Sequence, residues 1–306
     1  MEPRLLADHG VASCLEFGGA FGATREVSCM TTPHYVIRGG MEGRERLRVL
    51  ARVMAPTTNE LLARIGVEPT ARCLDVGCGG GDVTDALARL APEGSVVGVD
   101  LDETKIGMAR EEAAGAGVSN VEFRAHDVME PALDGDRFDV VYARFVLTHL
   151  PDPAKALANL CGHLAPGGVL VAEDIDCTGH FCEPHSPAFW RYVELYTKAV
   201  QRRGCDPNIG PRLPGLLRAA GLERLGVSVV QPAGISGEVK LLSPLTLEAI
   251  ADAVLAAGLA TDEELGELVD ELYAFAEQDG TLMSIPRVVQ AWGRKPLPQR
   301  TATSGT

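Results

Sequence analysis

The sequence lacks any long uninterrupted apolar run. No segment reaches the roughly 18 unbroken apolar residues that a membrane-spanning helix needs. The first residues, MEPRLLADHG, also lack the apolar stretch of a signal peptide. We therefore expect a cytoplasmic protein that is not embedded in a membrane.

Aromatic and basic side chains are scarce. Phe, Trp and Tyr make up 5% of the 306 residues, and 28 Lys and Arg stand against 42 Asp and Glu, which gives a formal net charge of −14. Such a charge repels a phosphate backbone, and few rings are available to stack on bases. The composition argues against nucleic acid as the main partner.

Paired cysteine motifs are absent, because the eight cysteines include no C-x-x-C pair. A chain of this length buries a core of its own and needs no disulfide or metal staple. Cys177, His180, Cys182 and His185 lie within nine residues and in principle offer zinc ligands. Their spacing matches no common structural zinc site, so a polar loop is the favoured interpretation and we expect no metal.

Strand-like apolar runs alternate with helix-period segments from about residue 71 onward. This alternation is typical of βαβ units and predicts an α/β protein with a parallel sheet. The expected strands lie at 71–76, 95–100, 121–125, 137–143 and 167–173, with a last one near 285–292. Between them, helices are expected at 82–90, 103–116, 154–164 and 213–220.

Helical additions interrupt this repeat at three places. The spacing of apolar residues predicts helices at 44–65, 187–203, 246–257 and 262–277. Because insertions on an enzyme scaffold gather where the chemistry occurs, we expect them to form one wall above the carboxyl ends of the strands. The expected division is a cap at 1–66, a core at 67–177, a lid helix within 178–203, further core at 204–242, a helical insertion at 243–280, a last core strand within 281–294 and a flexible tail at 295–306.

The strongest local signal is the segment CLDVGCGGGDVT at 73–84. An apolar strand runs into a glycine-rich turn at 77–81, and a helix begins at Asp82. Glycines permit positive φ and close approach of a ligand to the backbone, and a new helix presents free N–H groups. The segment therefore predicts a ligand-binding turn.

Three carboxylates surround this turn. Asp75 lies two residues before Gly77, Asp100 ends the next expected strand 23 residues after Gly77, and Asp127 closely follows the third strand. Open α/β sheets bind ligands at this edge, and an acid at the end of the second strand suits two ribose hydroxyls. For Asp127, an ordinary helix or turn cap is the alternative interpretation.

A dinucleotide such as NAD fits part of this pattern. Against it, Asp82 replaces the third glycine of the dinucleotide fingerprint, and Asp75 adds negative charge where a pyrophosphate would lie. A cationic sulfonium with an amino-acid tail, S-adenosylmethionine, suits the acidic turn better.

Taken together, LDVGCGGGDVT, VVGVDLD and AHDV resemble the class I, Rossmann-like methyltransferases that use S-adenosylmethionine, of the small-molecule type. The resemblance spans about 70–175 and implies a Rossmann-like, mostly parallel sheet with flanking helices and helical additions. It implies a cofactor site that includes Asp75, in which Gly77 and Gly79 border the methionine moiety, Asp100 with Leu101 binds the ribose, and Asp127 with Val128 holds the adenine.

Two further segments extend the resemblance. VVYARFVLTHLPDP at 140–153 is similar to the family's fourth strand, which implies that Arg144 and Phe145 line the pocket near the methionine end. HYVIRGGMEGRERL at 34–47 is similar to the entry segment of some small-molecule methyltransferases, which implies a cofactor contact by Tyr35. A surface turn that merely leads into the cap helix is the alternative at Tyr35.

Two residues are candidates for removing a proton from the acceptor or orienting it. Glu173 and Asp174 end the fifth expected strand, and adjacent side chains point to opposite faces of a strand, so at most one of them, by preference Glu173, faces the acceptor. His149 follows the fourth strand and is the second candidate, with a hydrogen-bonding or capping role as the alternative.

Aromatic residues of the expected lid helix offer a wall for an apolar acceptor. Trp190, Tyr192 and Tyr196 are spaced along 187–203, although core packing is the commoner use of such spacing.

The sequence thus predicts a methyltransferase that moves the methyl group of S-adenosylmethionine to a small-molecule acceptor by in-line displacement. An NAD-dependent oxidoreductase and a non-enzymatic protein that binds S-adenosylmethionine are the alternatives. The atom that accepts the methyl group and the oligomeric state, a homodimer included, are left open.

Overall fold

The computed structural model describes residues 43–130, 133 and 137–298 of the chain. Tyr35 and the glycine pair at 39–40 lie outside the described residues, as do most of the expected cap and the end of the tail. No helix among the described residues is both long and apolar enough to cross a membrane.

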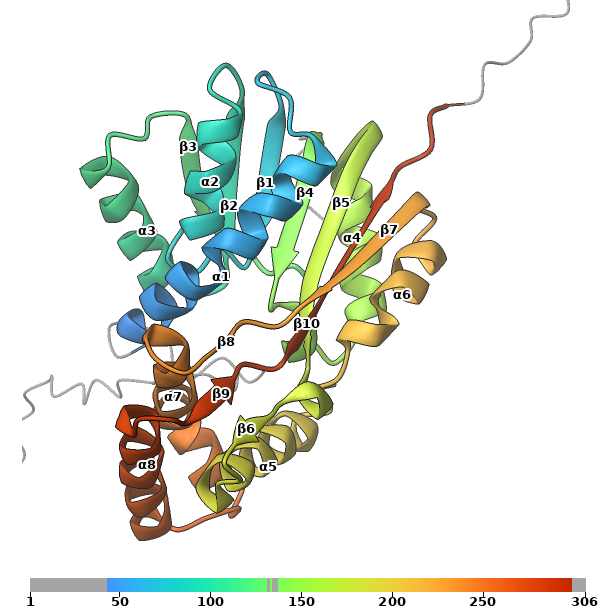
Figure 1. Ribbon diagram of the computed structural model, residues 1–306. Helices are drawn as coiled ribbons and strands as arrows, with labels where there is room; N and C mark the ends of the chain where they lie inside the picture. The colour runs from blue at the N-terminus through green and yellow to red at the C-terminus, as the bar shows by residue number, and fades with distance from the viewer. Residues whose placement is uncertain (1–42, 131–132, 134–136, 299–306) are drawn as a thin grey trace, which may run out of the picture. The chain divides into compact units, whose positions relative to one another are not determined.

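A seven-stranded sheet forms the centre of the fold (Figure 1). Its strand order is β3-β2-β1-β4-β5-β10-β7, in which the first five strands are parallel and β10 runs antiparallel to both of its neighbours. The strands are β1 (Arg72–Val76), β2 (Ser95–Asp100), β3 (Val121–Ala125), β4 (Phe138–Arg144), β5 (Leu164–Asp176), β7 (Glu223–Val230) and β10 (Arg287–Arg294).

Helices cover both faces of this sheet, which is why its central strands are nearly continuous apolar runs. On one face, Leu61, Leu62 and Leu87 from α1 and α2 pack over the sheet, while Leu157 and Leu217 from α4 and α6 pack on the other. The helix α3 packs against β2 and β3. These helices are α1 (Arg44–Ile65), α2 (Asp82–Leu90), α3 (Glu103–Gly115), α4 (Pro153–His163) and α6 (Leu213–Ala219).

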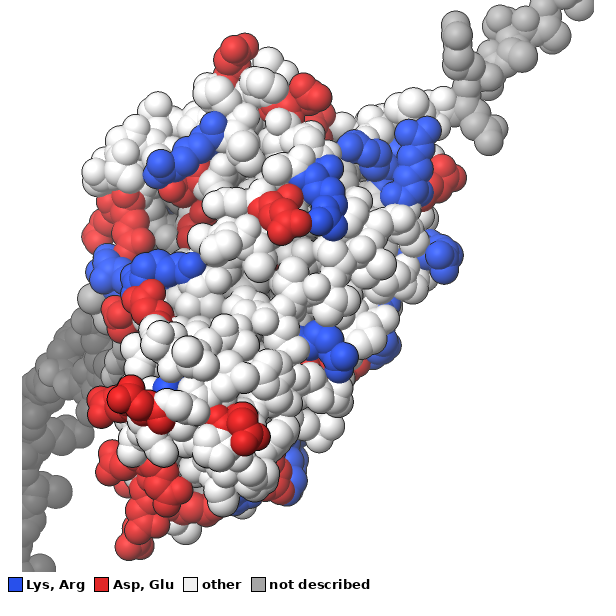
Figure 2. Space-filling model, viewed as in Figure 1, with Lys and Arg blue, Asp and Glu red and all other residues white. Residues whose placement is uncertain are grey.

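Three more helices, α5 (Pro187–Arg202), α7 (Leu242–Ala256) and α8 (Asp262–Glu277), gather beyond the carboxyl ends of the parallel strands (Figure 1). They share one apolar core, in which Phe189, Ile250 and Leu272 are fully buried. We call this group of helices the lid. Its outer surface is acidic, since Figure 2 shows Asp and Glu side chains gathered over α8.

Short elements connect the lid to the sheet. A small antiparallel sheet joins β6 (Cys182–Glu183), β9 (Leu282–Ser284) and β8 (Ala233–Gly234). Single turns of 3-10 helix, η1 (Leu147–His149), η2 (Cys177–Gly179), η3 (Gly210–Arg212) and η4 (Glu238–Leu241), lie in the loops.

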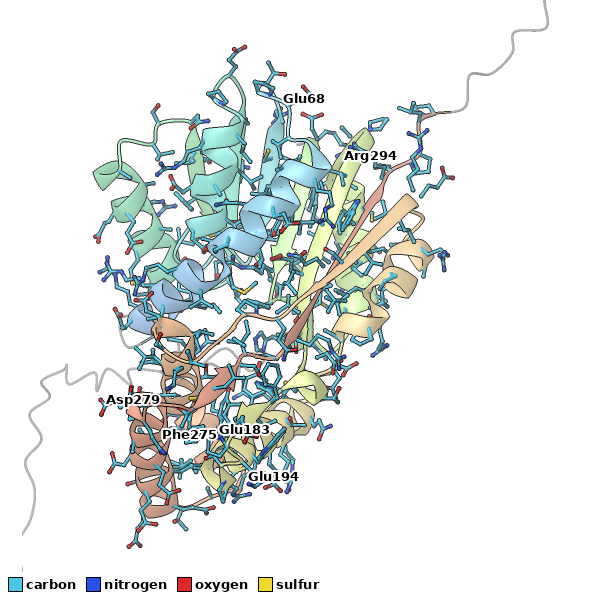
Figure 3. All side chains as sticks on the ribbon, viewed as in Figure 1. Glu68, Glu183, Glu194, Phe275, Asp279 and Arg294 are labelled. Atoms are coloured by element: carbon cyan, nitrogen blue, oxygen red, sulfur yellow. The ribbon has the colours of Figure 1, made fainter. Side chains whose placement is uncertain are left out.

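Ion pairs and hydrogen bonds fix α1 across the rest of the fold. Arg44 of α1 pairs with Glu112 of α3 at 2.8 Å, and Arg52 pairs with Glu238 of η4 at 2.6 Å. At the other end of α1, Arg294 of β10 donates a hydrogen bond to the carbonyl oxygen of Ile65 at 3.2 Å (Figure 3). The first turns of α1 are therefore held beside the glycine-rich turn.

The predicted fold class is confirmed. Every expected strand and helix occurs within a few residues of its expected place, and the central sheet is mostly parallel. The sequence analysis missed β7 and the small sheet. The strand β7 is an edge strand whose Val227 and Val229 are more than half exposed, so its apolar pattern does not resemble that of the buried strands.

Candidate active site

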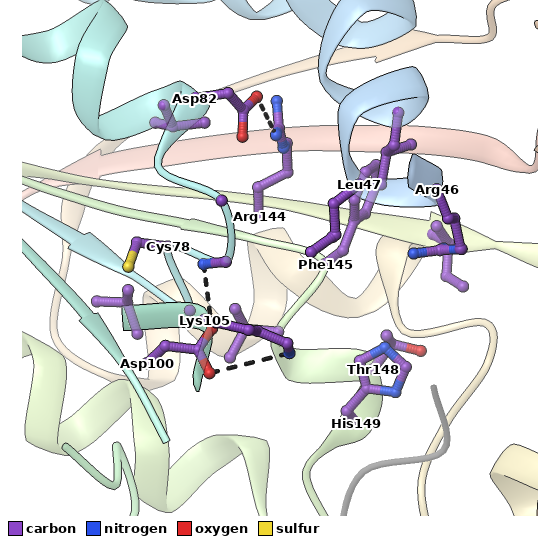
Figure 4. Close-up of a pocket in the computed structure, with 18 of the residues that line it drawn as sticks. Arg46, Leu47, Cys78, Asp82, Asp100, Lys105, Arg144, Phe145, Thr148 and His149 are labelled. Atoms are coloured by element: carbon purple, nitrogen blue, oxygen red, sulfur yellow. Dashed lines mark hydrogen bonds and ion pairs between the residues drawn. The ribbon is translucent and has the colours of Figure 1, made fainter. Parts of the chain in front are cut away.

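A cavity of about 190 Å³ lies at the carboxyl ends of the parallel strands, where the sheet meets α1 and the lid. Figure 4 shows this pocket with the side chains that reach it from the turn, from β2 and β4 and from α1. The residues predicted to bind the cofactor that line it are Asp75, Gly77, Gly79, Asp100, Leu101, Asp127, Val128 and Arg144. Tyr35 is outside the described residues.

The glycine-rich turn between β1 and α2 adopts a conformation that requires glycine. Gly77, Gly79 and Gly81 have φ values of 66°, 53° and 87°, in the left-handed region. At Gly77 a Cβ atom would lie 2.4 Å from Cγ2 of Val146, so there is no room for a side chain. The turn therefore brings bare backbone to the wall of the pocket.

Asp100, at the end of β2, is held by three groups. Its Oδ2 accepts a hydrogen bond from the backbone N–H of Gly79 at 3.1 Å (Figure 4), and its Oδ1 accepts one from the N–H of Asp102 at 3.0 Å. The ammonium group of Lys105 lies 3.9 Å from Oδ1. The carboxylate is thereby fixed at the pocket wall, with lone pairs that can accept from further donors.

Asp75, on β1, is almost fully buried beneath the turn. Its Oδ2 accepts a hydrogen bond from the hydroxyl group of Thr84 at 2.6 Å. Burial raises the pKa of Asp75 to about 7, so much of this group is neutral near pH 7. Asp75 consequently adds less negative charge beside the turn than the sequence analysis expected.

Asp127 follows β3, and its Oδ1 accepts a hydrogen bond from the N–H of Met129 at 2.8 Å. That bond is the turn-capping role that the sequence left as the alternative. Asp127 nevertheless lines the pocket together with Val128 and Leu101, so these residues combine a carboxylate with two apolar side chains.

Arg144 ends β4 and spans the space between the sheet and the helices above it. Its guanidinium group pairs with Asp82 at 2.6 Å (Figure 4) and donates to the hydroxyl group of Thr58 at 3.1 Å. The next residue, Phe145, has a φ of 56°, which is strained for a side chain of this size, and its N–H donates to the carbonyl oxygen of Glu173 at 2.8 Å. This sharp turn directs the chain after β4 along the pocket wall.

Glu173, the first candidate for facing the acceptor, does not line the described pocket. Its side chain is fully buried and accepts a hydrogen bond from the amide of Gln290 at 2.6 Å. In the sheet Glu173 pairs with Arg144 on β4 and Gln290 on β10, so it lies in a row of polar residues under α1. Burial raises its pKa, which Arg144 and Gln290 oppose.

Asp174 also lies outside the pocket lining, on the opposite face of β5. Its carboxylate accepts hydrogen bonds from the N–H groups of Thr148 at 3.0 Å and Ile175 at 2.8 Å. Burial raises the pKa of Asp174 to about 7 despite these bonds. It anchors η1 in place and does not meet a ligand there.

His149, the second candidate, does line the pocket (Figure 4). It ends η1 and is 3% exposed. Burial lowers the pKa of His149 to about 3, and the positive charges of Arg46 and Lys105 act in the same direction. Its imidazole is therefore neutral at pH 7.

The lid contributes the remaining wall. Tyr192 and Tyr196 from α5 line the pocket as expected, whereas Trp190 is 37% exposed and is not among the described lining residues. From α7, Thr246 lines the pocket and accepts a hydrogen bond from the guanidinium Nε of Arg46 at 3.0 Å. The helix α8 packs behind α5 and α7 and does not reach the described pocket wall.

Three lining residues, Arg46, Lys105 and His180, carry chemistry that the sequence analysis did not assign to the site. Lys105 carried a detectable signal, because it follows Asp100 by five residues at the start of a helix. Arg46 and His180 lie in segments that the sequence singled out for other reasons, and they reach the pocket only through the packing of α1 and the lid. Among the described residues, no three His, Cys, Asp or Glu side chains are arranged to hold a metal ion.

Comparison with known proteins finds likenesses for the core of this site. Residues 68–199 match the family model of a methyltransferase domain. This part of the chain is therefore similar to methyltransferase domains, in agreement with the family that its sequence motifs resemble. The match includes the glycine-rich turn, Asp100, Asp127 and Arg144, but it excludes α1, α7 and β10.

Relatives of the methyltransferase domain have been named for small-molecule chemistry. The chain is 39% identical over 108 residues to a ubiquinone biosynthesis O-methyltransferase of Sinorhizobium fredii, which covers 35% of this chain and 42% of that protein. It is 37% identical over 114 residues to a trans-aconitate 2-methyltransferase of Variovorax paradoxus, which covers 37% of this chain and 42% of that protein. The chain thus spans less than half the length of these relatives.

The crystal structure of a candidate methyltransferase from Bacillus halodurans shares the fold of the chain. The two superpose with a TM-score of 0.54 at 24% sequence identity, over 78% of this chain and 98% of that one. This likeness extends the agreement in architecture beyond the methyltransferase domain itself.

Proposed function

We propose that the chain binds S-adenosylmethionine at the glycine-rich turn and transfers its methyl group to a small-molecule acceptor enclosed by α1 and the lid. One observation carries this proposal: a single pocket is lined both by the turn of the methyltransferase domain and by Arg46, Tyr192 and Thr246 from the helical additions. A cofactor and a second small ligand can therefore meet in one cavity.

The residues at the cofactor end fit S-adenosylmethionine. Asp100 keeps lone pairs for the ribose hydroxyls, and Leu101 and Val128 offer apolar contacts for adenine beside Asp127. The absence of a Cβ at Gly77 and Gly79 leaves space for the methionine moiety. These assignments agree with what the resemblance implies for each position.

The acceptor end is enclosed in part by residues outside the matched segment 68–199. Leu242 and Thr246 of α7, Ile285 after β9 and Arg46 of α1 line this part of the pocket. The relatives named for ubiquinone biosynthesis and for trans-aconitate support a small-molecule acceptor. A wall built from additions to the common core is where acceptor preference is expected to reside.

The chain's main contribution to the reaction is positioning. When bound, S-adenosylmethionine supplies a methyl group on an already activated sulfonium. The turn and Asp100 fix one reactant, and the lid fixes the other while excluding water, so that nucleophile, carbon and sulfur lie in line. His149 is neutral and lines the wall after β4, so it is suited to orient the acceptor by a hydrogen bond.

Methyl transfer from isotopically labelled S-adenosylmethionine to a panel of phenols, carboxylic acids and amines tests the proposal. The expected result is labelled product from at least one class, accompanied by stoichiometric S-adenosylhomocysteine. Binding of S-adenosylhomocysteine without transfer to any acceptor class would favour a non-enzymatic binding protein instead.

A further inference from the structure

The imidazole of His180 is held in one tautomer at the lid end of the pocket. The side chain is 6% exposed, and its Nδ1 lies 2.9 Å from the carbonyl oxygen of Cys177. A carbonyl oxygen can only accept a hydrogen bond, so Nδ1 must carry the proton. In the neutral ring, the lone pair is then assigned to Nε2.

This lone pair has no partner within the described part of the chain. Nε2 of His180 is buried and takes part in no hydrogen bond there. The ring is packed edge to face against Phe189 at 5.8 Å and Tyr192 at 6.2 Å between centroids, which fixes its plane. A buried acceptor atom without a donor is unfavourable, and His180 is one of the residues that line the pocket, so a ligand that reaches Nε2 from the pocket would supply the missing donor.

The ring is neutral near pH 7. Burial lowers the pKa of His180 to about 4, and the hydrogen bond to the Cys177 carbonyl and the charge of Asp176 oppose this shift. The lone pair on Nε2 is therefore available for a ligand under ordinary conditions.

The surroundings of His180 restrict what that ligand is. Ile175, Tyr192 and Ile285 line the same end of the pocket and favour a flat apolar body. The positive charge of Arg46 opposes the burial-driven rise in the pKa of Tyr192 and Tyr196, so its field reaches this end of the pocket. A protonated amine would be repelled there, whereas a neutral hydroxyl group would not.

We propose that Nε2 of His180 accepts the hydroxyl hydrogen of a phenol-like acceptor bound in this pocket, and that it takes the proton during methyl transfer. This inference rests on the proposed function. It assigns to His180 the role that the sequence analysis gave to Glu173.

The acceptor oxygen forms a bond to the methyl carbon, the carbon–sulfur bond breaks, and its electron pair stays on sulfur. The hydroxyl proton passes to Nε2, so the positive charge moves from sulfur to the imidazole, and the products are a methyl ether and S-adenosylhomocysteine. An oxygen that is gaining a methyl group becomes strongly acidic, so even a weakly basic imidazole can take its proton.

Two substitutions separate this role from a structural one. His180→Asn keeps an amide N–H near the position of Nδ1 for the Cys177 carbonyl but removes Nε2. His180→Gln places an amide oxygen near the position of Nε2, so it retains a hydrogen-bond acceptor while losing the base.

The probes are 2-naphthol and its methyl ether, 2-methoxynaphthalene, titrated into the full chain. The wild-type protein is expected to bind 2-naphthol roughly tenfold more tightly than the ether, because only the hydroxyl group donates to Nε2. His180→Asn should abolish this preference and His180→Gln should retain it. The proposal would be overturned if His180→Asn preferred 2-naphthol over the ether as strongly as the wild type does, or if the wild type did not bind 2-naphthol.

The reaction supplies a second readout. With S-adenosylmethionine and 2-naphthol, His180→Gln should lower kcat at least tenfold while the Kd of 2-naphthol stays within about twofold of the wild-type value. Equal kcat values for His180→Gln and the wild type would show that Nε2 takes no proton.

Two measurements keep the inference independent of variant folding and of the proposed function. In the wild-type protein labelled with ¹⁵N-histidine, NMR should show His180 protonated at Nδ1 only, and the reverse tautomer would contradict the assignment. If S-adenosylhomocysteine binds but the preference for 2-naphthol over its ether is absent, the inference about His180 fails and the proposed function stands. If S-adenosylhomocysteine does not bind, the proposed function fails, and the naphthol titration without cofactor still tests His180.

Discussion

The backbone N–H of Gly79 donates a hydrogen bond to Oδ2 of Asp100 at 3.1 Å, which joins the glycine-rich turn to the end of β2. A residue after β1 and a residue at the end of β2 are thus fixed relative to one another. The same carboxylate accepts from the N–H of Asp102 at the start of α3. Asp100 therefore organises the two loops that form the cofactor end of the pocket.

Asp100→Asn is expected to weaken binding of S-adenosylhomocysteine by about tenfold to a hundredfold, because hydrogen bonds to a charged group contribute roughly 1.5–3 kcal/mol. Isothermal titration calorimetry measures the change. Glu60→Gln, which removes an exposed carboxylate on α1, is the matched control and should leave affinity unaltered. Wild-type affinity in a well-folded Asp100→Asn protein would remove Asp100 from the site.

Gly77→Ala is expected to destabilise the fold by at least about 1–2 kcal/mol from its left-handed φ alone, with a further loss from the contact with Val146. When Val146→Ala is added to the Gly77→Ala variant, it should restore only the part of the free energy of unfolding that the contact with Val146 had removed. Urea denaturation gives both free energies of unfolding.

Gly107→Ala is the control for that series. Gly107 lies inside α3, and a Cβ there meets no atom within 4 Å, so alanine should stabilise the helix by up to about 1 kcal/mol. If Gly77→Ala and Gly107→Ala changed stability by the same amount, the turn would not require glycine at position 77.

The sequence was sufficient for features that depend on local pattern. Buried strands such as β2 are apolar throughout, and the glycines at 77–81 mark a turn whose positive φ values few other residues adopt. The carboxylates Asp75, Asp100 and Asp127 could be placed at one sheet edge because parallel strands end together.

Features that depend on distant partners could not be predicted. Glu173 lies on an inner strand as expected, but whether its side chain meets a ligand depends on Arg144 of β4 and Gln290 of β10. His180 gains its role from the Cys177 carbonyl and from the rings of α5, whose packing no local pattern encodes.

Asp174 should make stability depend on pH. Its pKa is about 7 in the folded protein and about 4 when unfolded, so the folded state binds more protons between these values and stability falls as pH rises through this range. Relative to Asp174→Asn, the wild-type free energy of unfolding should decrease by up to about 2.6 kcal/mol from pH 5 to pH 8. A difference that stays constant or increases with pH, measured by urea denaturation, would contradict this sign.

Adjacent aromatic residues of α5 should differ in their contribution to the lid. Phe189 is fully buried in the lid core and Trp190 is 37% exposed. Phe189→Ala is expected to destabilise the protein by about 3–5 kcal/mol, and Trp190→Ala by less than half of that. Thermal unfolding of both variants provides the comparison, and equal losses would show that Trp190 is packed as tightly as its neighbour.

Calorimetric titration of the full chain with S-adenosylhomocysteine and, separately, with NAD shows which cofactor the pocket at the carboxyl ends of the strands binds. We expect saturable binding of one S-adenosylhomocysteine per chain and no measurable binding of NAD. Saturable binding of NAD without binding of S-adenosylhomocysteine would rule out S-adenosylmethionine as the cofactor of this pocket.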